Sequence, residues 1–416
     1  MRKNLNKNET LYLEKLISKY ENNKDVVSRY PLLENAFINK DILEGIKVLL
    51  SQQLTMSEIT YKFERDFAKH VGSKYAIMVN SGSSANLLAS FALINPKKKN
   101  RVNKGDSFII PSLCWSTSLW PLIQCGLKPI FVDVDINNFC LDEKKITNKL
   151  LEKIKVILTI HILGNSSNIE EIAFKAKKRG IYLIEDTCEA LGSTFNSKFL
   201  GTFGDFGTYS FYYSHQITAG EGGMIVTNSI EDYNILCSLR SHGWDRKIGK
   251  KIKKNNSYFN FINSGFNVRP TDINAAIGYS QFKRLNRLIE IRKRNRLKII
   301  NSIKKSKNWN NQFDFFYSNQ KVNQSFFGFP ILINKKYLNK KKQFLNFLKN
   351  KNIETRPIIS GNFLNQPSSK LYNLNKNNLK FPISQEIEDR GFFIGLPSQP
   401  IGEENLKYLV KNLLSI

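Results

Sequence analysis

Short apolar runs rich in β-branched residues recur through the first half of the chain, and a helical stretch separates each run from the next. The runs lie at residues 76–80, 107–110, 129–133, 156–160 and 181–185. Such runs are typical of strands that are buried on both faces, and parallel strands need a long connection between them. The alternation therefore predicts an α/β fold, with a mostly parallel sheet covered by helices on both faces.

The segments on either side of this pattern have a different character. Residues 1–55 are polar with helical periodicity, and we expect them to form an N-terminal helical arm. A charged helical stretch at 283–305 is followed by the apolar run 327–333 and a terminal helix, which indicate a smaller α+β unit. We therefore expect a large domain over 56–285 and a small C-terminal domain over 286–416, each with its own core.

The charge balance is strongly basic. The chain has 63 lysine and arginine residues against 35 aspartate and glutamate residues, which gives a formal net charge of +28. The basic residues are scattered among asparagines, as at 334–342, and are not gathered in a stripe. This pattern favours a solvated surface that at most draws in anionic substrates, and no nucleic-acid partner is expected.

Membrane and metal sites have little support in the sequence. No run of 18 or more apolar residues occurs, and the first residues do not resemble a signal peptide. We therefore expect no membrane association and a cytoplasmic location. The five cysteines are odd in number and form no C-x-x-C pair, so buried free thiols are expected, without a metal or disulfide framework.

Polar residues that suit cofactor chemistry follow three of the predicted strands. The segment 80–86 (NSGSSAN) joins a strand to a helix, where N–H groups and hydroxyls hold either a phosphate or only the helix end. Asp186 follows the run 181–185 and is either a carboxylate of a binding site or the cap of a helix. Trp115 follows the run 107–110 and is either a ring that stacks on a ligand or a core residue.

A fourth segment, GDFGTYSFYYSH at 204–215 followed by EGGMIV, resembles the cofactor-lysine segment of the DegT/StrS-type sugar aminotransferases. These enzymes use pyridoxal phosphate (PLP) and have the aspartate-aminotransferase-like fold of type I. The three segments above resemble the same family, as do LRSHGW at 239–244 and GFNVRPTD at 265–272, and the resemblance spans roughly residues 30–415. The family residue that corresponds to His215 is a lysine, which forms a Schiff base with the cofactor.

The resemblance implies a role for each matching residue. Cofactor binding is expected from Gly82, Ser83 and Ser210 at the phosphate, Trp115 on the ring face, Asp186 at the pyridine nitrogen, and Glu189 beside it. Because active sites of the family lie at a homodimer interface, Asn267 is expected to reach the cofactor phosphate of a partner subunit. Arg269 and Arg356 suit substrate phosphate or the carboxylate of an amino donor.

A histidine at the lysine position separates the branches of the family. An aminotransferase needs that lysine, which the segment around His215 lacks, and Lys247 would need a different loop geometry. An iron–sulfur dehydratase needs clustered cysteines, but 245–266 has none, and Cys188 and Cys237 alone cannot ligate a cluster. A non-catalytic PLP-binding homologue stays open as a further alternative.

The resemblance thus implies a 3-dehydratase that holds PLP or pyridoxamine phosphate (PMP) non-covalently and has no iron–sulfur cluster. Its expected substrate is a nucleotide-linked 4-keto-6-deoxyhexose, with GDP-4-keto-6-deoxymannose favoured, in deoxysugar and O-antigen biosynthesis. L-Glutamate is expected to convert PLP to PMP. His215 would then remove a cofactor proton and protonate the leaving C3 hydroxyl, and a histidine that titrates near neutrality suits both steps.

Overall fold

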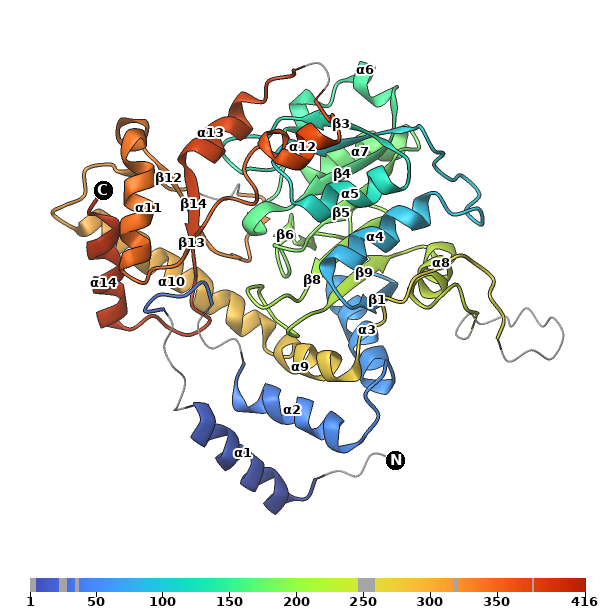
Figure 1. Ribbon diagram of the computed structural model, residues 1–416, viewed down its shortest axis with the longest axis horizontal. Coiled ribbons are helices and arrows are strands. Elements are labelled where there is room, and N and C mark those ends of the chain that lie inside the picture. Colours follow the sequence, from blue (N-terminus) through green and yellow to red (C-terminus); the bar gives the residue numbers. More distant parts are fainter. Residues whose placement is uncertain (1–4, 22–27, 34–36, 246–258, 317–319, 376–377) are drawn as a thin grey trace.

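The computed structural model describes residues 5–21, 28–33, 37–245, 259–316, 320–375 and 378–416. A seven-stranded sheet lies in the larger part of the molecule and a four-stranded sheet in the smaller part (Figure 1). The N-terminal helices α1 (Lys7–Glu21) and α2 (Asn39–Leu50) lie along the outside, with α2 against α9 (Asp272–Phe282). Within the described ranges, we find no helix with the length and apolar character needed to cross a membrane.

The large sheet has the predicted character. Its spatial order is β1 (Tyr75–Val79), β9 (Gly223–Thr227), β8 (Phe206–Ser210), β5 (Tyr182–Asp186), β4 (Ile154–Ile160), β2 (Ser107–Pro111) and β3 (Lys128–Val132). From β8 to β3 all neighbours are parallel, whereas β9 is antiparallel to both β1 and β8. The α/β class and the mostly parallel sheet are confirmed. Strand β8 escapes sequence prediction because FGTYS lacks a continuous apolar run.

Helices cover both faces of this sheet. Ile77 and Val79 of β1 pack in a core with α4 (Gly82–Leu93), α5 (Ser116–Gln124) and α8 (Ile230–Arg240). The intervening Ala76 and Met78 join a second core with α3 (Glu58–Val71). Successive strand residues point to opposite faces, so an entirely apolar strand requires this double cover. The short α6 (Asn148–Leu151) and α7 (Ile169–Lys178) complete the layers.

The smaller part is antiparallel. Its sheet has the order β10 (Phe313–Asp314), β12 (Phe329–Ile333), β14 (Gly391–Ile394) and β13 (Thr355–Arg356). Four helices accompany it, namely α11 (Lys341–Asn350), α12 (Pro367–Leu371), α13 (Pro382–Arg390) and α14 (Glu403–Leu413). The long helix α10 (Leu285–Lys305) leads into it, and a third sheet joins β11 (Val322–Asn323) to β6 (Thr194–Phe195) and β7 (Lys198–Phe199). The exact domain boundaries at 55/56 and 285/286 stay predictions.

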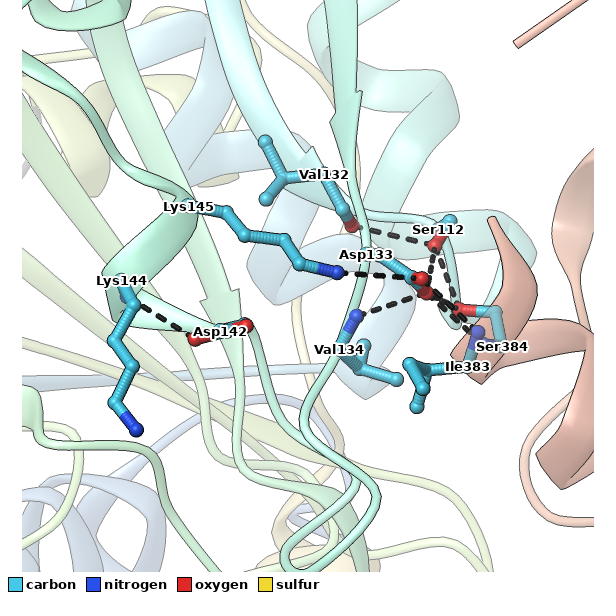
Figure 2. A network of polar contacts seen from close by, with 9 residues as sticks. All are labelled: Ser112, Val132, Asp133, Val134, Asp142, Lys144, Lys145, Ile383 and Ser384. Carbon is cyan, nitrogen blue, oxygen red and sulfur yellow. Dashed lines mark hydrogen bonds and ion pairs between the residues drawn. The ribbon is translucent and has the colours of Figure 1, made fainter. Parts of the chain in front are cut away.

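Asp133, directly after β3, ties the two parts together (Figure 2). Its buried carboxylate accepts hydrogen bonds from the backbone N–H groups of Ile383 (3.0 Å) and Ser384 (2.9 Å) at the start of α13. Burial alone would raise the pKa of Asp133, but these hydrogen bonds outweigh it and hold that pKa below its ordinary value. The Oγ atoms of Ser384 and Ser112 lie 2.6 Å apart, which links α13 to the loop that carries Trp115.

Candidate active site

A cleft of about 1350 Å³ opens beside the carboxyl ends of the parallel strands. The loops after β1, β2, β5 and β8 contribute to its lining, because carboxyl ends of parallel strands meet at one edge of a sheet. The four-stranded sheet contributes the opposite wall through Arg356 and Phe393. Eight of the ten predicted site residues line this cleft: Gly82, Ser83, Trp115, Asp186, Glu189, Ser210, His215 and Arg356.

The start of helix α4 forms a cradle for an anion. The Ser81 hydroxyl accepts from an N–H in the first turn of α4 at 3.0 Å, and other N–H groups there lack partners within the helix. Ser210, the last residue of β8, packs directly against Gly82, where an added Cβ would lie 2.5 Å from the Ser210 Cβ. The Ser83 hydroxyl donates to Thr117 Oγ1 at 2.9 Å. Two chain segments thus converge where the sequence predicts a phosphate.

Asp186 is a buried carboxylate at the end of β5, with 4% of its surface exposed. Its Oδ2 accepts from Asn86 Nδ2 (2.8 Å) and Ser118 Oγ (2.7 Å), and its Oδ1 from the Cys188 N–H (3.1 Å). Thr208 Oγ1 donates to Asn86 Oδ1 at 2.6 Å and so orients that amide. Sequence reasoning missed these partners, because they lie on other elements, 100 and 68 residues away in the case of Asn86 and Ser118.

Trp115 is exposed in the cleft and does not belong to the core. Its side chain is 55% exposed, and the residue directly precedes α5. The loop around it is held by the smaller part of the molecule. The Ser360 hydroxyl donates to Cys114 O at 2.6 Å, and the Phe363 N–H donates to Ser112 O at 2.9 Å. An aromatic face is therefore available to a planar ligand.

His215 lies in the turn after β8, with its ring directed between two aromatic side chains. Its N–H donates to Tyr212 O at 3.1 Å. The imidazole meets the Phe327 ring edge-on at 5.0 Å and the Tyr212 ring at 6.0 Å, and its Nδ1 has no hydrogen-bond partner in the described part of the chain. These contacts hold the imidazole at the cleft, and its buried Nδ1 is left without a hydrogen-bond partner.

The expectation that His215 titrates near neutrality is wrong for the protein without ligands. Burial, together with the positive charge of Arg292, lowers the pKa of His215 to about 3. The protonated form is disfavoured because a charged imidazole loses its hydration here and is repelled by the guanidinium. At neutral pH the residue is a neutral imidazole, which is the form that a proton acceptor needs.

Glu189 has the opposite electrostatic character. Burial raises the pKa of this carboxyl to about 8, even though the Leu163 N–H donates to its Oε2 at 2.8 Å. Near neutral pH it therefore holds a proton for much of the time. Paired groups with pKa values shifted in opposite directions are typical of acid–base sites.

The outer cleft contains a segment that sequence analysis did not assign to it. Residues 28–33, expected within a helical arm, are not helical and lie at the cleft, where Tyr30 bridges to Ile353. Nearby, Arg356 Nη2 lies 3.8 Å from Glu354 Oε2. Residues 28–33 and the segment of β13 therefore both line the outer part of the cleft.

Asn267 and Arg269 do not line the cleft of their own chain. Asn267 is exposed and forms an isolated bridge with Ser241, and neither residue is part of the cleft lining. Their predicted roles need a second subunit and stay predictions. Lys247, the lysine considered for an aminotransferase, lies outside the described residues.

Comparison with known proteins shows which family has this architecture. The profile of the DegT/DnrJ/EryC1/StrS aminotransferase family matches residues 37–413. The chain belongs to this family. The family resemblance predicted from the sequence motifs is thereby confirmed, together with the type I fold.

Members with solved structures include close relatives. GDP-4-keto-6-deoxy-D-mannose 3-dehydratase of Escherichia coli O55:H7 is 39% identical over 376 residues, which cover 88% of this chain and 95% of that protein. A structure of the E. coli enzyme with bound hydrated PLP has a TM-score of 0.82 at 38% identity and covers 93% and 99% of the two chains. A structure of GDP-4-keto-6-deoxymannose-3-dehydratase with a trapped PLP–glutamate geminal diamine has a TM-score of 0.83 at 37% identity and covers 92% of this chain and 100% of that chain.

Within this aminotransferase family, the cleft departs from the lysine-dependent pattern. Among the residues that the structure describes, none that lines the cleft is a lysine. The described residues also bring together no group of three histidine, cysteine, aspartate or glutamate side chains suited to a metal. The phosphate cradle, the buried carboxylate and the exposed indole nevertheless converge as in a PLP site.

Proposed function

We propose that this protein is a PLP- and PMP-dependent 3-dehydratase of a nucleotide-linked 4-keto-6-deoxyhexose, with GDP-4-keto-6-deoxymannose as substrate. The observation that supports this most is that His215, with a pKa lowered to about 3, lines a cleft together with Gly82, Ser210 and Asp186, and no described residue of that lining is a lysine. A histidine moves a proton but forms no stable imine, which supports elimination of a hydroxyl over transfer of an amine to product. The relatives with this activity support the same reading.

The residues of the cleft fit the cofactor. The start of α4 and Ser210 would hold its phosphate, and Trp115 would cover one face of its ring. Asp186, fixed by three hydrogen bonds, would hold a proton on the pyridine nitrogen. When bound, the cofactor would supply a carbon that can carry an amino group and a ring that accepts electrons.

Proton movement would fall to two residues. His215, neutral at working pH, accepts the proton that must leave for the C3–O bond to break, and then returns it to the departing hydroxyl. Glu189 holds a proton near neutral pH and can donate a hydrogen bond to a sugar oxygen. Arg356 at the cleft mouth would bind phosphate or the carboxylate of L-glutamate, the proposed donor. The relative with a trapped PLP–glutamate adduct supports this choice.

A homodimer with shared active sites is part of the proposal, since Asn267 and Arg269 lie outside the cleft of their own chain. The cytoplasmic location expected from the sequence also stays a prediction, which cell fractionation would test.

The test uses purified protein with PLP, glutamate and a panel of 4-keto-6-deoxy nucleotide sugars. Addition of glutamate should shift the absorbance from the PLP band to the PMP band. The correct sugar should then release ammonia and give a product lighter by one oxygen atom, by mass spectrometry. The variant His215→Asn, which lacks the proton acceptor, should lose ammonia release and the lighter product. A protein that binds PLP and never forms PMP would contradict the proposal, as would an amino sugar as product.

A further inference from the structure

Arg292, on α10, lies directly behind His215 and has only 2% of its surface exposed. Its Nη2 donates to the main-chain oxygen of His215 at 3.2 Å. Its Nη1 faces the main-chain oxygens of Phe326 (3.3 Å) and Phe327 (3.5 Å). The guanidinium therefore bridges the turn that carries His215 and the segment that carries Phe327, whose ring meets the imidazole edge-on.

The charge of Arg292 has no counter-ion. Within the described residues no carboxylate lies at ion-pair distance, and its Nε has no hydrogen-bond partner. Arg240, also fully buried, differs because Glu64 lies 2.5 Å from it. Burial lowers the pKa of Arg292 to about 10, so the guanidinium stays charged at neutral pH. An uncompensated buried charge is costly to the fold, which points to a use other than stability.

We propose that Arg292 is a positioning residue for His215, which clamps the imidazole between two segments and keeps it in the base form. This inference deepens the proposed function and rests on it. The clamp acts through hydrogen bonds to three main-chain oxygens, and the control of protonation acts through the unpaired charge. Anionic phosphates that enter the cleft would offset this charge, so His215 would become able to hold a proton only when ligands are bound.

Other charged groups near His215 do not duplicate this effect. The cleft side presents Asp186, Glu189, Glu221, Cys188, Tyr212 and Tyr213, with Arg29, Glu354 and Arg356 further out. A smaller cavity of about 170 Å³ behind the histidine presents Arg284, Arg287 and Arg292. Arg284 is neutralised by Asp41 at 2.5 Å, and Arg287 is exposed to solvent, so Arg292 is the buried cation that acts on the imidazole.

The first measurement needs no activity. Histidine side-chain NMR of the cofactor-free protein between pH 4 and 8, with His215 assigned through His215→Asn among the four histidines, reports its protonation directly. In the wild type the His215 signal should stay at the neutral position throughout. Arg292→Met should raise the pKa of His215 by about one pH unit, so that its signal begins to move to the protonated position at the acid end of this range, because one of the two causes of the low pKa is removed. Arg292→Lys, which keeps the charge, should restore the wild-type behaviour.

Kinetics separate the clamp from the charge. Arg292→Met should lower kcat for dehydration about 10- to 100-fold and move the acid limb of the kcat profile upward. Arg292→Lys should leave the limb in place and recover only part of kcat, since an ammonium cannot span the three oxygens. A purely structural role would lower kcat equally at every pH in both variants, and that result would overturn the proposal.

Arg296→Met is the matched control. Arg296 is 5% exposed, one turn further along α10, and its guanidinium lies 4.7 Å from the Phe326 ring centre. Its loss should leave the His215 signal unmoved. An equal shift in both Met variants would mean general loosening and would refute the role of Arg292. If the wild type shows the NMR behaviour but releases no ammonia, the proposed function fails while the control of His215 by Arg292 stands.

Discussion

An imidazole at position 215 cannot trap the cofactor as a lysine amine would, and this difference gives a test on one side chain. His215→Lys should bind PLP covalently, so that borohydride fixes the cofactor to the protein, and should lose dehydration by at least about 100-fold. Mass spectrometry of the reduced protein and an ammonia assay check the two outcomes. His215→Asn, which offers no amine, is the control without covalent attachment. Parental dehydration by the lysine variant would exclude His215 as the base.

Gly82 gives a second prediction at this scale, because it lies where α4 and β8 converge. A Cβ there would lie 2.5 Å from the Ser210 Cβ and 3.0 Å from the Cys188 Sγ. Gly82→Ala should therefore push the two segments apart and raise the Kd for PLP at least about tenfold, a loss of roughly 1.4 kcal/mol. Absorbance titration with PLP measures it. Gly402→Ala is the control, because a Cβ at Gly402 would have no neighbour within 4 Å, and this variant should leave the Kd for PLP unchanged. An equal rise in the Kd of both variants would contradict the role of Gly82 in the phosphate site.

Single residues also show where sequence reasoning succeeds and where it stops. Gly82, Trp115 and Asp186 were predictable because each follows an apolar run that forms a strand, and parallel strands end at one edge of a sheet. His215 was predictable only from the family resemblance of residues 204–215, because strand β8 before it has no apolar run. The protonation of His215 was not, since it depends on burial and on a cation 77 residues away. Pairings of this kind leave no local pattern in a sequence.

At the scale of elements, the tie between β3 and α13 should dominate the stability of the contact between the two sheets. Asp133→Ala removes a carboxylate that accepts two backbone N–H groups at the helix start, as well as the Ser384 hydroxyl (Figure 2). The free energy of unfolding should fall by about 2–4 kcal/mol, because the buried donors lose their partner. Urea unfolding measures it. Asp142→Ala, whose carboxylate receives one hydrogen bond from Lys144, should cost under about 1 kcal/mol.

This contribution depends on pH in a defined direction. The folded pKa of Asp133 lies below its ordinary value, so its stabilisation is complete above the unfolded pKa of about 3.9. It is lost as the pH falls through the folded pKa. The stability gap between wild type and Asp133→Ala should therefore be constant from pH 7 to 5 and narrow below about pH 4. A stability difference that grew larger in acid would contradict a stabilising role of the Asp133 carboxylate at the start of α13.

Elements were predicted unevenly for a physical reason. Strands 107–111 and 182–186 are recognisable in the sequence as apolar runs, because both of their faces are buried. Strand β8 carries polar residues that serve the site, and residues 28–33 follow the cleft in place of a helix. In both segments the structure differs from what local sequence preference predicts. Both segments line the cleft, where the geometry of the site outweighs that preference.

At the scale of the whole molecule, the proposed homodimer makes a prediction that no single chain can satisfy. Asn267 lies outside the cleft of its own chain and is proposed to reach the cofactor phosphate of the partner subunit. His215→Asn and Asn267→Asp should each be nearly inactive alone, since one lacks the base and the other sets a carboxylate against a phosphate. A hybrid dimer would concentrate both defects in one site and leave the other site intact.

Equal mixing of the two variants, after unfolding and refolding together, should therefore restore about a quarter of wild-type dehydration. Half of the random dimers are hybrids, and each hybrid has one intact site of two. Refolding of either variant alone is the control. Two residues that act in the same chain's site would give no recovery, because every site of the mixture would then carry a defect. Recovery near a quarter would identify Asn267 as a residue that acts across the subunit boundary.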